Sequence, residues 1–588
     1  MGALEFKGQR IEITFDEYLQ LDNLSEHLLM SPPQKNPPEV KVRGKKLVIQ
    51  LQDTLRDSTT YTIDFGNAVC DYREKVPLKG YSFYFSTGPT IDTLVYTGYV
   101  YDAMNMNPLK GIFVGIHEDK EDSAFVSTPF TRVAKTDSTG HFRIGNMKEG
   151  RYRLYAVDEV SRDYRLTIGE GLAWADEEIE GRIEKKPVPQ RTDSLAQDSL
   201  AQDSVPQDTL LQAVALQDTL LQTVALQDTL IQKPAPIEEG ILFLFKEEQQ
   251  RLYLQRTLRK EKHLIQILFS SEPDSLPELR FLQDSVQDSL GVRLNYITKY
   301  SPHHDTVSLW LADSLSVAQD SLFIEARYRR TDSLYQLEWY TDTLRAIWRA
   351  PKLSAKARQA QERQNRNRRL DLKSNANAKF EIYDTLYLEC KTPLASIECD
   401  SFHLYERIDT ILKPMKFSIA DHDTLPMRLH ILADLKPDKK YELVVDSGAL
   451  HDIYGVTHIK GTYSLQVKTP SDYSTLRVKL NPFVPKARIQ ILNKNDNVVR
   501  ELPAIPEGAF FEYLTPDTYY MRLYIDENED GKWTTGSWEK KRQPEKVYYF
   551  PESIQTKSNW DFDEEWDYQA VEQTKAKPAA LIKASSKK

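Results

Sequence analysis

The stretch "YIDENEDGKWTTGSWEK" at 524–540 carries the pattern that comes nearest to a metal site. Oxygen-bearing side chains at alternate positions, followed by Gly531, resemble the opening of a calcium loop, because the backbone must curl around a hard cation and glycine permits the sharp turn. Position twelve, where a bidentate glutamate is usual, holds Ser537. A polar hairpin turn, for which Asp-Gly is itself a signal, explains the same letters equally well. The candidate calcium ligands are Asp526, Asn528, Asp530 and Glu539.

The rest of the chain offers no recognisable catalytic constellation. It has no P-loop, no GxGxxG after a strand, no GxSxG and no HExxH. The run His303-His304-Asp305 fits a loop better than a metal site, because adjacent histidines on a strand point to opposite faces. The acidic run at 559–568 fits the end of a strand better than a pair of hydrolytic carboxylates. We therefore predict no catalytic residue.

Three cysteines are too few to staple a small fold. Cys390 and Cys399 flank "KTPLASIE" and could form a disulfide in an oxidising compartment, whereas Cys70 has no obvious mate. The favoured alternative is that all three are small buried hydrophobic residues.

Composition sets the outer bounds. A chain of 588 residues predicts roughly four domains of about 100–200 residues each. The net charge of −10 gives no electrostatic case for nucleic-acid binding. No apolar run approaches the roughly 20 residues that a membrane-spanning helix needs. The opening "MGALEFKGQRIEITF" lacks the features of a signal peptide and enters a strand pattern at once, as if the chain began inside a domain.

Alternation of apolar and polar residues predicts β-strands along most of the chain. Segments such as "RIEITF" (10–15), "TYTIDF" (60–65) and "YSFYFST" (81–87) alternate at period two between clusters of turn residues. Short strands at this spacing, without long amphipathic helices, favour antiparallel sandwiches over βαβ units.

The strand pattern is duplicated. The sequence from Thr60 aligns with that from Lys440, so that Tyr61 falls on Tyr441 and Asp71 on Asp452. In the same alignment Gly80 falls on Gly461 and Thr87 on Thr469, with one or two residues of drift. The unit that follows is repeated too, as "YRLYAVDE" from residue 152 and "MRLYIDE" from residue 521. We therefore expect two copies of a two-domain unit rather than a solenoid, whose period would be much shorter.

Three segments lie outside the duplicated pair. A further β-rich region covers about 241–348. The basic stretch 349–380 has helix formers but almost no apolar face, which indicates a solvated helix or coil, with binding to an anionic surface as the alternative. The last residues, ending "KAKPAALIKASSKK", read as a disordered tail.

The first ninety residues resemble the SbsA-type bacterial Ig-like domain, through "IEITFDEYL", "KKLVIQLQDTLRDSTTYTIDFGNAVCD" and "YSFYFSTG". The next unit, with "GYVYDAMNMNPLKGIFVGIHED" and "AKTDSTGHFRIGNMKEGRYRLYAVD", resembles a carboxypeptidase-regulatory or transthyretin-like β-sandwich. Together they resemble a family of envelope lipoproteins of the Bacteroidota, whose members carry a lipidated amino-terminal cysteine. This chain shows neither that cysteine nor its signal sequence. The resemblance implies an extracytoplasmic protein of the cell envelope, in the periplasm or on the outer-membrane surface.

The same resemblance offers an interpretation of a low-complexity repeat. Asp-Ser/Thr followed by Leu or Val recurs at steps of five and then ten between residues 193 and 230. Bacteroidota attach O-glycans at such triplets, and a polar, aperiodic segment keeps each hydroxyl accessible, as in mucin-like stalks. A plain flexible linker spread by replication slippage is the alternative. The candidate glycosylation sites are Ser194, Ser199, Ser204, Thr209, Thr219 and Thr229.

The sequence as a whole predicts an all-β chain of tandem Ig-like and transthyretin-like β-sandwiches, joined by a low-complexity linker and a basic linker. We expect a non-catalytic scaffold or binding protein, whose partner is an unknown protein or glycan at the cell envelope and whose only candidate cofactor is calcium. The alternative is a set of accessory domains of a glycan- or peptide-acting hydrolase with its site in 239–348. The expected boundaries are 1–90 (Ig-like), 91–180 (transthyretin-like), 181–238 (linker), 239–348 (β-rich), 349–376 (basic linker), 377–470 (second Ig-like), 471–568 (second transthyretin-like) and 569–588 (tail).

Overall fold

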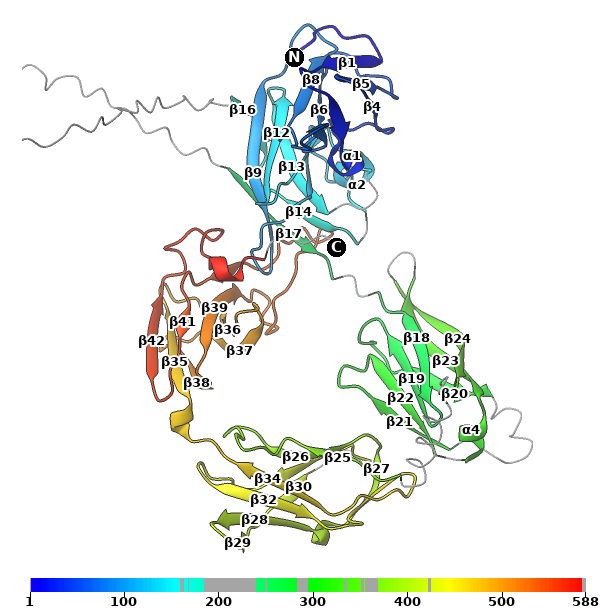
Figure 1. Cartoon of the computed structure of the whole chain (residues 1–588), viewed down its shortest axis with the longest axis vertical. Coiled ribbons are helices and arrows are strands. Elements are labelled where there is room, and N and C mark those ends of the chain that lie inside the picture. The colour runs from blue at the N-terminus through cyan, green and yellow to red at the C-terminus, as the bar shows by residue number, and fades with distance from the viewer. Residues whose placement is uncertain are drawn as a thin grey trace, which may run out of the picture.

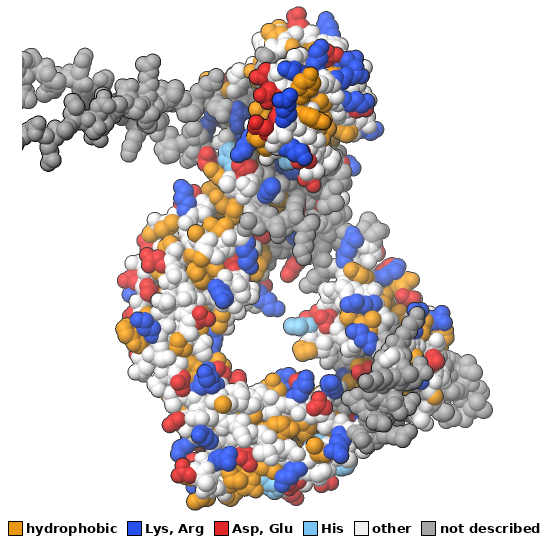
Figure 2. Space-filling model, in the orientation of Figure 1, with side chains coloured by type: hydrophobic (Ala, Val, Ile, Leu, Met, Phe, Trp, Pro, Cys, Tyr) orange, Lys and Arg blue, Asp and Glu red, His pale blue; other side chains and the backbone are white. Residues whose placement is uncertain are grey.

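The computed structural model describes residues 2–158, 163–167, 169–183, 239–248, 251–282, 295–312, 314–332, 336–350, 354, 368–420 and 425–583. These residues form five β-sandwiches; the second to the fifth surround an open centre, and the first lies at the top of the view, beyond the second (Figures 1 and 2). The described helices are single turns, such as α1 (Leu24–His27), α2 (Ala124–Ser127) and α4 (Ser314–Ala318), and none of them could cross a membrane. The prediction of an all-β chain of tandem sandwiches is confirmed.

The first sandwich covers residues 2–88. Its sheets have the orders β1-β5-β4, β2-β7 and β3-β6-β8. The apolar residues of alternate strand positions, Tyr61, Ile63 and Phe85 among them, are fully buried, as period-two alternation requires. The strands are β1 (Arg10–Thr14), β2 (Leu19–Leu21), β3 (Leu29–Ser31), β4 (Glu39–Arg43), β5 (Lys46–Gln50), β6 (Thr60–Asp64), β7 (Val69–Asp71) and β8 (Ser82–Ser86).

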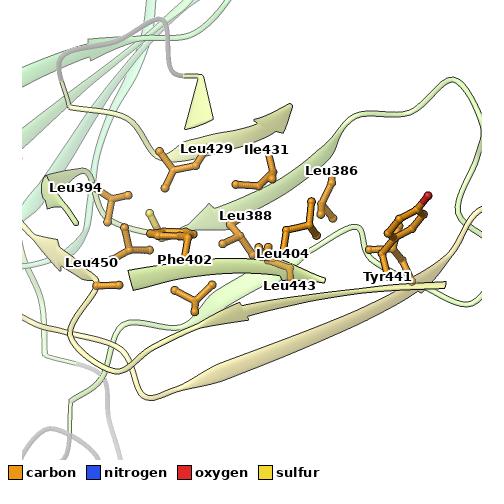
Figure 3. Packing of buried hydrophobic residues seen from close by; sticks show 14 of the residues in the cluster. Leu386, Leu388, Leu394, Phe402, Leu404, Leu429, Ile431, Tyr441, Leu443 and Leu450 are labelled. Atoms are coloured by element: carbon orange, nitrogen blue, oxygen red, sulfur yellow. The ribbon is translucent and has the colours of Figure 1, made fainter. Parts of the chain in front are cut away.

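The fourth sandwich, residues 368–469, repeats this topology. Its sheets have the orders β25-β26-β31-β30, β27-β33 and β29-β28-β32-β34, so β25 and β29 are additions at sheet edges. Its core lies between the sheets (Figure 3) and is lined by residues such as Leu388, Phe402 and Leu443. The strands are β25 (Leu372–Ser374), β26 (Leu386–Cys390), β27 (Leu394–Ile397), β28 (Phe402–Ile408), β29 (Ile411–Pro414), β30 (Ser418–Ala420), β31 (Arg428–Leu432), β32 (Lys440–Val445), β33 (Leu450–Asp452) and β34 (Gly461–Gln466).

Two matched details confirm the predicted duplication beyond strand order. The buried hydroxyls of Tyr61 and Tyr441 each accept a hydrogen bond from the backbone N–H five residues upstream, both at 2.7 Å. Asp71 and Asp452 each follow a short strand and accept backbone N–H groups of the next turn. The residues paired in the sequence alignment therefore occupy equivalent positions in the two sandwiches.

The second sandwich contains residues 94–183 together with 240–246. Strand β17 (Gly240–Lys246) pairs in parallel with β9 (Leu94–Asp102) and antiparallel with β14 (Gly171–Trp174). The close approach of β17 depends on Gly98, because a Cβ there would collide with the carbonyl of Gly240. The remaining strands are β10 (Phe113–His117), β11 (Arg132–Lys135), β12 (His141–Met147), β13 (Arg151–Asp158), β15 (Ile179–Glu180) and β16 (Arg182–Ile183).

This arrangement changes the meaning of the low-complexity segment. The sequence analysis treated 181–238 as a linker between two domains and began the third region at 239. In the structure β16 and β17, which flank the segment, both pair with β9, so the chain leaves and re-enters one sandwich. A parallel last strand gave no local signal, because "ILFLF" fits any buried strand. All six candidate glycosylation sites lie outside the described residues.

The fifth sandwich repeats the second. Strand β42 (Asp561–Trp566) pairs in parallel with β35 (Ser474–Leu480), as β17 does with β9. The acidic run at 559–568 is thus this last strand and its flanks, as expected. The other strands are β36 (Ala487–Leu492), β37 (Val498–Pro503), β38 (Ala509–Leu514), β39 (Thr518–Ile525), β40 (Val547–Tyr549) and β41 (Ile554–Gln555).

The third sandwich, residues 252–347, has no sequence counterpart in the duplicated units. Its sheets have the orders β18-β19-β22-β21 and β20-β23-β24. The pair His303-His304 lies in the turn between β21 and β22, as predicted. The strands are β18 (Leu254–Glu261), β19 (Leu264–Phe269), β20 (Glu278–Phe281), β21 (Tyr296–Tyr300), β22 (Thr306–Leu311), β23 (Ser321–Thr331) and β24 (Leu337–Ile347).

Two further expectations differ from the structure. No disulfide joins Cys390 to Cys399: Cys390 is buried in β26, where its thiol donates to the carbonyl of Thr392 (3.0 Å), and Cys399 is exposed. Burial raises the pKa of Cys390 to about 12, so the thiol stays protonated. The tail is not disordered up to residue 583, because Ala576 and Leu581 are buried against the fifth sandwich.

Candidate functional site

The predicted calcium loop follows β39 and curls as the pattern requires. Asp526 is buried, and its two carboxylate oxygens accept the backbone N–H groups of Asp530 (3.2 Å) and Gly531 (2.9 Å). Gly531 has φ +76°, in the left-handed region that favours glycine. The Asp530-Gly531 step therefore forms a tight turn in this loop.

The other two loop residues lie beside Asp526. The Asn528 side chain accepts the Asp530 N–H at 3.2 Å and donates to Asp530 Oδ2 at 3.0 Å. Thr534 also donates to Asp530 Oδ2, at 3.2 Å. The three predicted ligands therefore converge, and their oxygens are satisfied by hydrogen bonds within the loop.

Glu545, not Glu539, is the glutamate beside this loop. Its carboxylate accepts the N–H groups of Glu527 (2.9 Å) and Thr534 (2.8 Å), whereas Glu539 is exposed. Burial raises the pKa of Glu545, and the nearby charge of Asp526 adds to that shift. The sequence could not single out Glu545, because it lies fourteen residues beyond the glycine, outside the spacing of a calcium loop.

Hydrogen bonds within the loop are sufficient to hold it as a turn without any bound ion. Within the described ranges, no three His, Cys, Asp or Glu side chains form a group that could hold a metal. A calcium ion would therefore have to use the Asn528 oxygen and backbone carbonyls beside Asp526, Asp530 and Glu545. Calcium binding stays a prediction.

The hairpin that continues from the loop docks on the second sandwich. Trp538 makes edge-on ring contacts with Phe125, Tyr155 and Trp174, with centroids 5.0, 5.8 and 5.2 Å away. Edge-to-face pairs at this spacing add to the stabilisation from burial alone. Nearby, Gly536 lies against the ring of Phe245, which any side chain at this position would strike.

Polar contacts surround this aromatic insertion. The backbone N–H of Trp538 donates to the Glu247 carboxylate (2.5 Å), and the Thr535 hydroxyl donates to the Lys246 carbonyl (2.8 Å). The Gln543 amide donates to Asp176 at 2.8 Å. A buried aromatic anchor with a polar rim is the usual anatomy of a specific protein interface.

A second contact joins the same two sandwiches through the end of the chain. Lys577 is buried, and its ammonium donates to the Asn105 carbonyl (2.6 Å), Asn107 Oδ1 (2.8 Å) and Asp496 Oδ2 (2.8 Å). Burial lowers the pKa of Lys577, opposed by the Asp496 carboxylate. Removing one partner of such a buried pair would leave an uncompensated charge.

Sequence reasoning missed this interface. The only signal was the unusual density of tryptophan in "GKWTTGSWEK", part of the stretch predicted to be either a calcium loop or a hairpin turn. The contact joins residues more than 350 positions apart, for example Gln543 and Asp176, and no local pattern encodes that.

Comparison with known proteins supports the first sandwich most directly. Residues 1–87 match the family of the bacterial Ig-like domain. A search of the curated proteins gave no match.

Solved structures give distant resemblances only. The N-terminal part of the bacterial S-layer protein SbsC is 12% identical, with a TM-score of 0.13, over 32% of this chain and 43% of that one. A structure of domains 1–6 of the same S-layer protein is 9% identical over 91% of this chain and 66% of that one, with a TM-score of 0.12. A marsupial T cell receptor is 9% identical over 64% of this chain and 100% of that one, with a TM-score of 0.13. The chain thus spans less than two thirds of either SbsC structure, and scores this low carry no argument about function.

Proposed function

We propose that the protein is a non-catalytic scaffold or binding protein of the bacterial cell surface. The observation that carries the proposal is the interface between the second and fifth sandwiches, which ties distant parts of the chain together. Half-buried Trp538 and buried Lys577 contribute two independent contacts to this interface. A chain closed on itself in this way presents several modules in a fixed geometry, which is what a scaffold needs and a flexible tether does not.

The finer assignment extends this proposal to the envelope of a member of the Bacteroidota, with lipid anchoring and O-glycosylation. Its support is the resemblance of the sequence motifs and the match of residues 1–87 to a bacterial Ig-like domain.

Protease treatment of intact cells of the native host tests the location. We expect the protein to fractionate with the envelope and to be cleaved without cell lysis, whereas recovery in the cytosolic fraction would overturn the proposal. Peptide mass spectrometry between residues 191 and 233 tests the glycans. Only unmodified Ser and Thr in that segment would remove them from the proposal and leave the surface location untouched.

A further inference from the structure

A cleft of about 980 Å³ lies between the third and fourth sandwiches. The third sandwich contributes the outer face of β19 and β22, and the fourth contributes the chain entering β25, the end of β26 and the turn after β33. Clefts of this size between domains are preferred places for ligand sites. Neither the calcium loop nor the Trp538 interface shares a residue with it.

The wall from the third sandwich is polar. Alternation along β19 and β22 sends Ile265, Ile267 and Leu309 into the core, fully buried, and leaves the residues between them on the cleft side. Gln266 pairs with Ser308 across these two strands, and Thr306 lies one step further along the same face. Hydroxyl and amide groups therefore form this wall.

Trp310 follows Thr306 and Ser308 on the cleft face of β22, and its indole N–H is a hydrogen-bond donor without a partner in the described structure. Only 4% of the residue is exposed. The buried hydroxyl of Tyr454, which packs edge-on against His263 with ring centroids 5.2 Å apart, also lacks a partner in the described part of the chain. Of these two groups only Trp310 lines the cleft, and its buried, unpartnered N–H indicates a place where a ligand supplies a hydrogen bond.

The wall from the fourth sandwich has an excess of available positive charge. Its acidic residues are Asp371, Glu389 and Asp452, one fewer than its cationic residues; Glu389 pairs with Arg428 at 3.0 Å, and Asp452 accepts the Thr392 hydroxyl and two backbone N–H groups. Arg368 lies over the Tyr454 ring at 5.4 Å. The cationic residues of this wall are Arg368, Arg369, Lys373 and Lys391.

We propose that the cleft binds an acidic oligosaccharide, with its carboxylates towards the cationic wall and its hydroxyls on the polar wall. An extended peptide fits less well, because on the third-sandwich wall β19 and β22 are interior strands whose backbone groups are already paired, and the edge strand on the other wall, β25, has three residues only. Recognition must therefore use side chains, and hydroxyls, amides and cations suit a ligand rich in hydroxyl and carboxylate groups. This assignment rests on the proposed binding role and names its ligand class.

Isothermal titration of the full chain with a hexamer of galacturonic acid tests the proposal. We expect binding that a neutral hexamer of glucose does not show and that weakens as salt is raised. Arg369→Glu with Lys391→Glu should weaken binding at least tenfold, and Trp310→Phe, which keeps an aromatic ring but removes the N–H, should weaken it severalfold. The matched control is Lys413→Glu with Lys416→Glu, two exposed lysines outside the cleft, which should change nothing.

Three outcomes would overturn the assignment. They are no binding of the acidic hexamer, equal weakening in cleft and control variants, and equally tight binding of hexaglutamate, which would mean a general attraction for polyanions or peptides. Thermal melting of each variant confirms that it folds. Since protease accessibility on cells is independent of this titration, failure here leaves the proposed surface role standing.

Discussion

The second and fifth sandwiches share the order of their equivalent strands, a parallel last strand and an arginine on the central strand, half-buried in the second and buried in the fifth, yet they differ in two connections. Before its last strand the second sandwich carries residues 184–239, whereas the fifth crosses from β41 to β42 in five residues. After its central strand the fifth has the long Asp526–Lys546 hairpin, which reaches across to the second. The sheets fix the fold, and each copy has acquired its own feature in a loop, where insertions cost little.

The hairpin should give the largest effect. Trp538→Ala removes the ring that packs on Phe125, Tyr155 and Trp174, and we expect it to cost about 3 kcal/mol, as such truncations do. Thermal unfolding and small-angle scattering should show a lower melting point and a larger radius of gyration. Trp560→Ala, in the same sandwich but 56% exposed, is the matched control and should change neither. An unchanged radius in the Trp538 variant would mean that this insertion does not hold the two sandwiches together.

Calcium distinguishes the two copies if the loop binds it. The second sandwich keeps Asp158 but has Val160 and Arg162 where the fifth has Asn528 and Asp530. An arginine would repel a cation, so only the fifth copy should respond. Calcium at a hundredfold over its dissociation constant would add about 2.7 kcal/mol by mass action.

The measurement is thermal melting of the full chain in millimolar calcium or in chelator. Asp526→Ala with Asp530→Ala should abolish the shift. If calcium does not change the melting point of the unaltered chain, or shifts that of the variant equally, the loop is a turn and not a calcium site.

The sequence correctly predicted the features that rest on its internal repeat and on the alternation of apolar and polar residues. Period-two patterns fixed the all-β class, and the Tyr61–Tyr441 alignment identified true structural equivalents. It failed where long-range contacts decide: the assignment of β17 depends on a strand more than 100 residues away, and the ordered tail and the Trp538 contact depend on partners more than 400 residues away. It also gave no sign that Glu545 accepts N–H groups of the loop after β39, since this glutamate comes close only after the hairpin folds back.

Shortening the connection in the second sandwich should have a smaller, opposite effect. The end of β16 and the start of β17 meet β9 at Leu94 and Gly98, four positions and therefore about 13 Å apart, which a short Gly-Ser connection spans. Replacing 187–236 with about ten such residues should leave the fold intact and stabilise it by up to about 1.5 kcal/mol through lower loop-closure entropy. If 181–238 were instead a spacer between two domains, the replacement would displace β17 and lower the melting point.

The smallest effect concerns the arginine on each central strand and the residue opposite it, whose hydrogen bonding differs between the two copies. On the central strands Arg522 donates to Gln490 at 2.7 Å. The equivalent pair in the second sandwich is Arg153 and His117, placed opposite each other by the same register. There the His117 Nε2 and the Arg153 Nε are buried without hydrogen-bond partners in the described structure.

His117→Gln should reproduce the fifth-sandwich solution. A new hydrogen bond to Arg153 is worth about 1 kcal/mol. The substitution also removes an acid sensitivity, because burial lowers the pKa of His117 to about 4, against the opposing charge of Asp119. Between pH 6.5 and about 4 the unfolded chain binds a proton that the folded chain does not, so the free energy of unfolding falls as the pH is lowered through that window.

Chemical denaturation of both proteins from pH 7 to pH 4 measures the difference. The variant should be more stable at pH 7, and its advantage should grow towards pH 4. Gln490→His is the reciprocal change and should weaken the fifth sandwich most at low pH, because it places an imidazole beside Arg522. If the free energy of unfolding has the same pH dependence in the parent and in the His117 variant, the imidazole is not buried as the sheet places it. The two sandwiches would then not differ in acid sensitivity at this pair of equivalent positions.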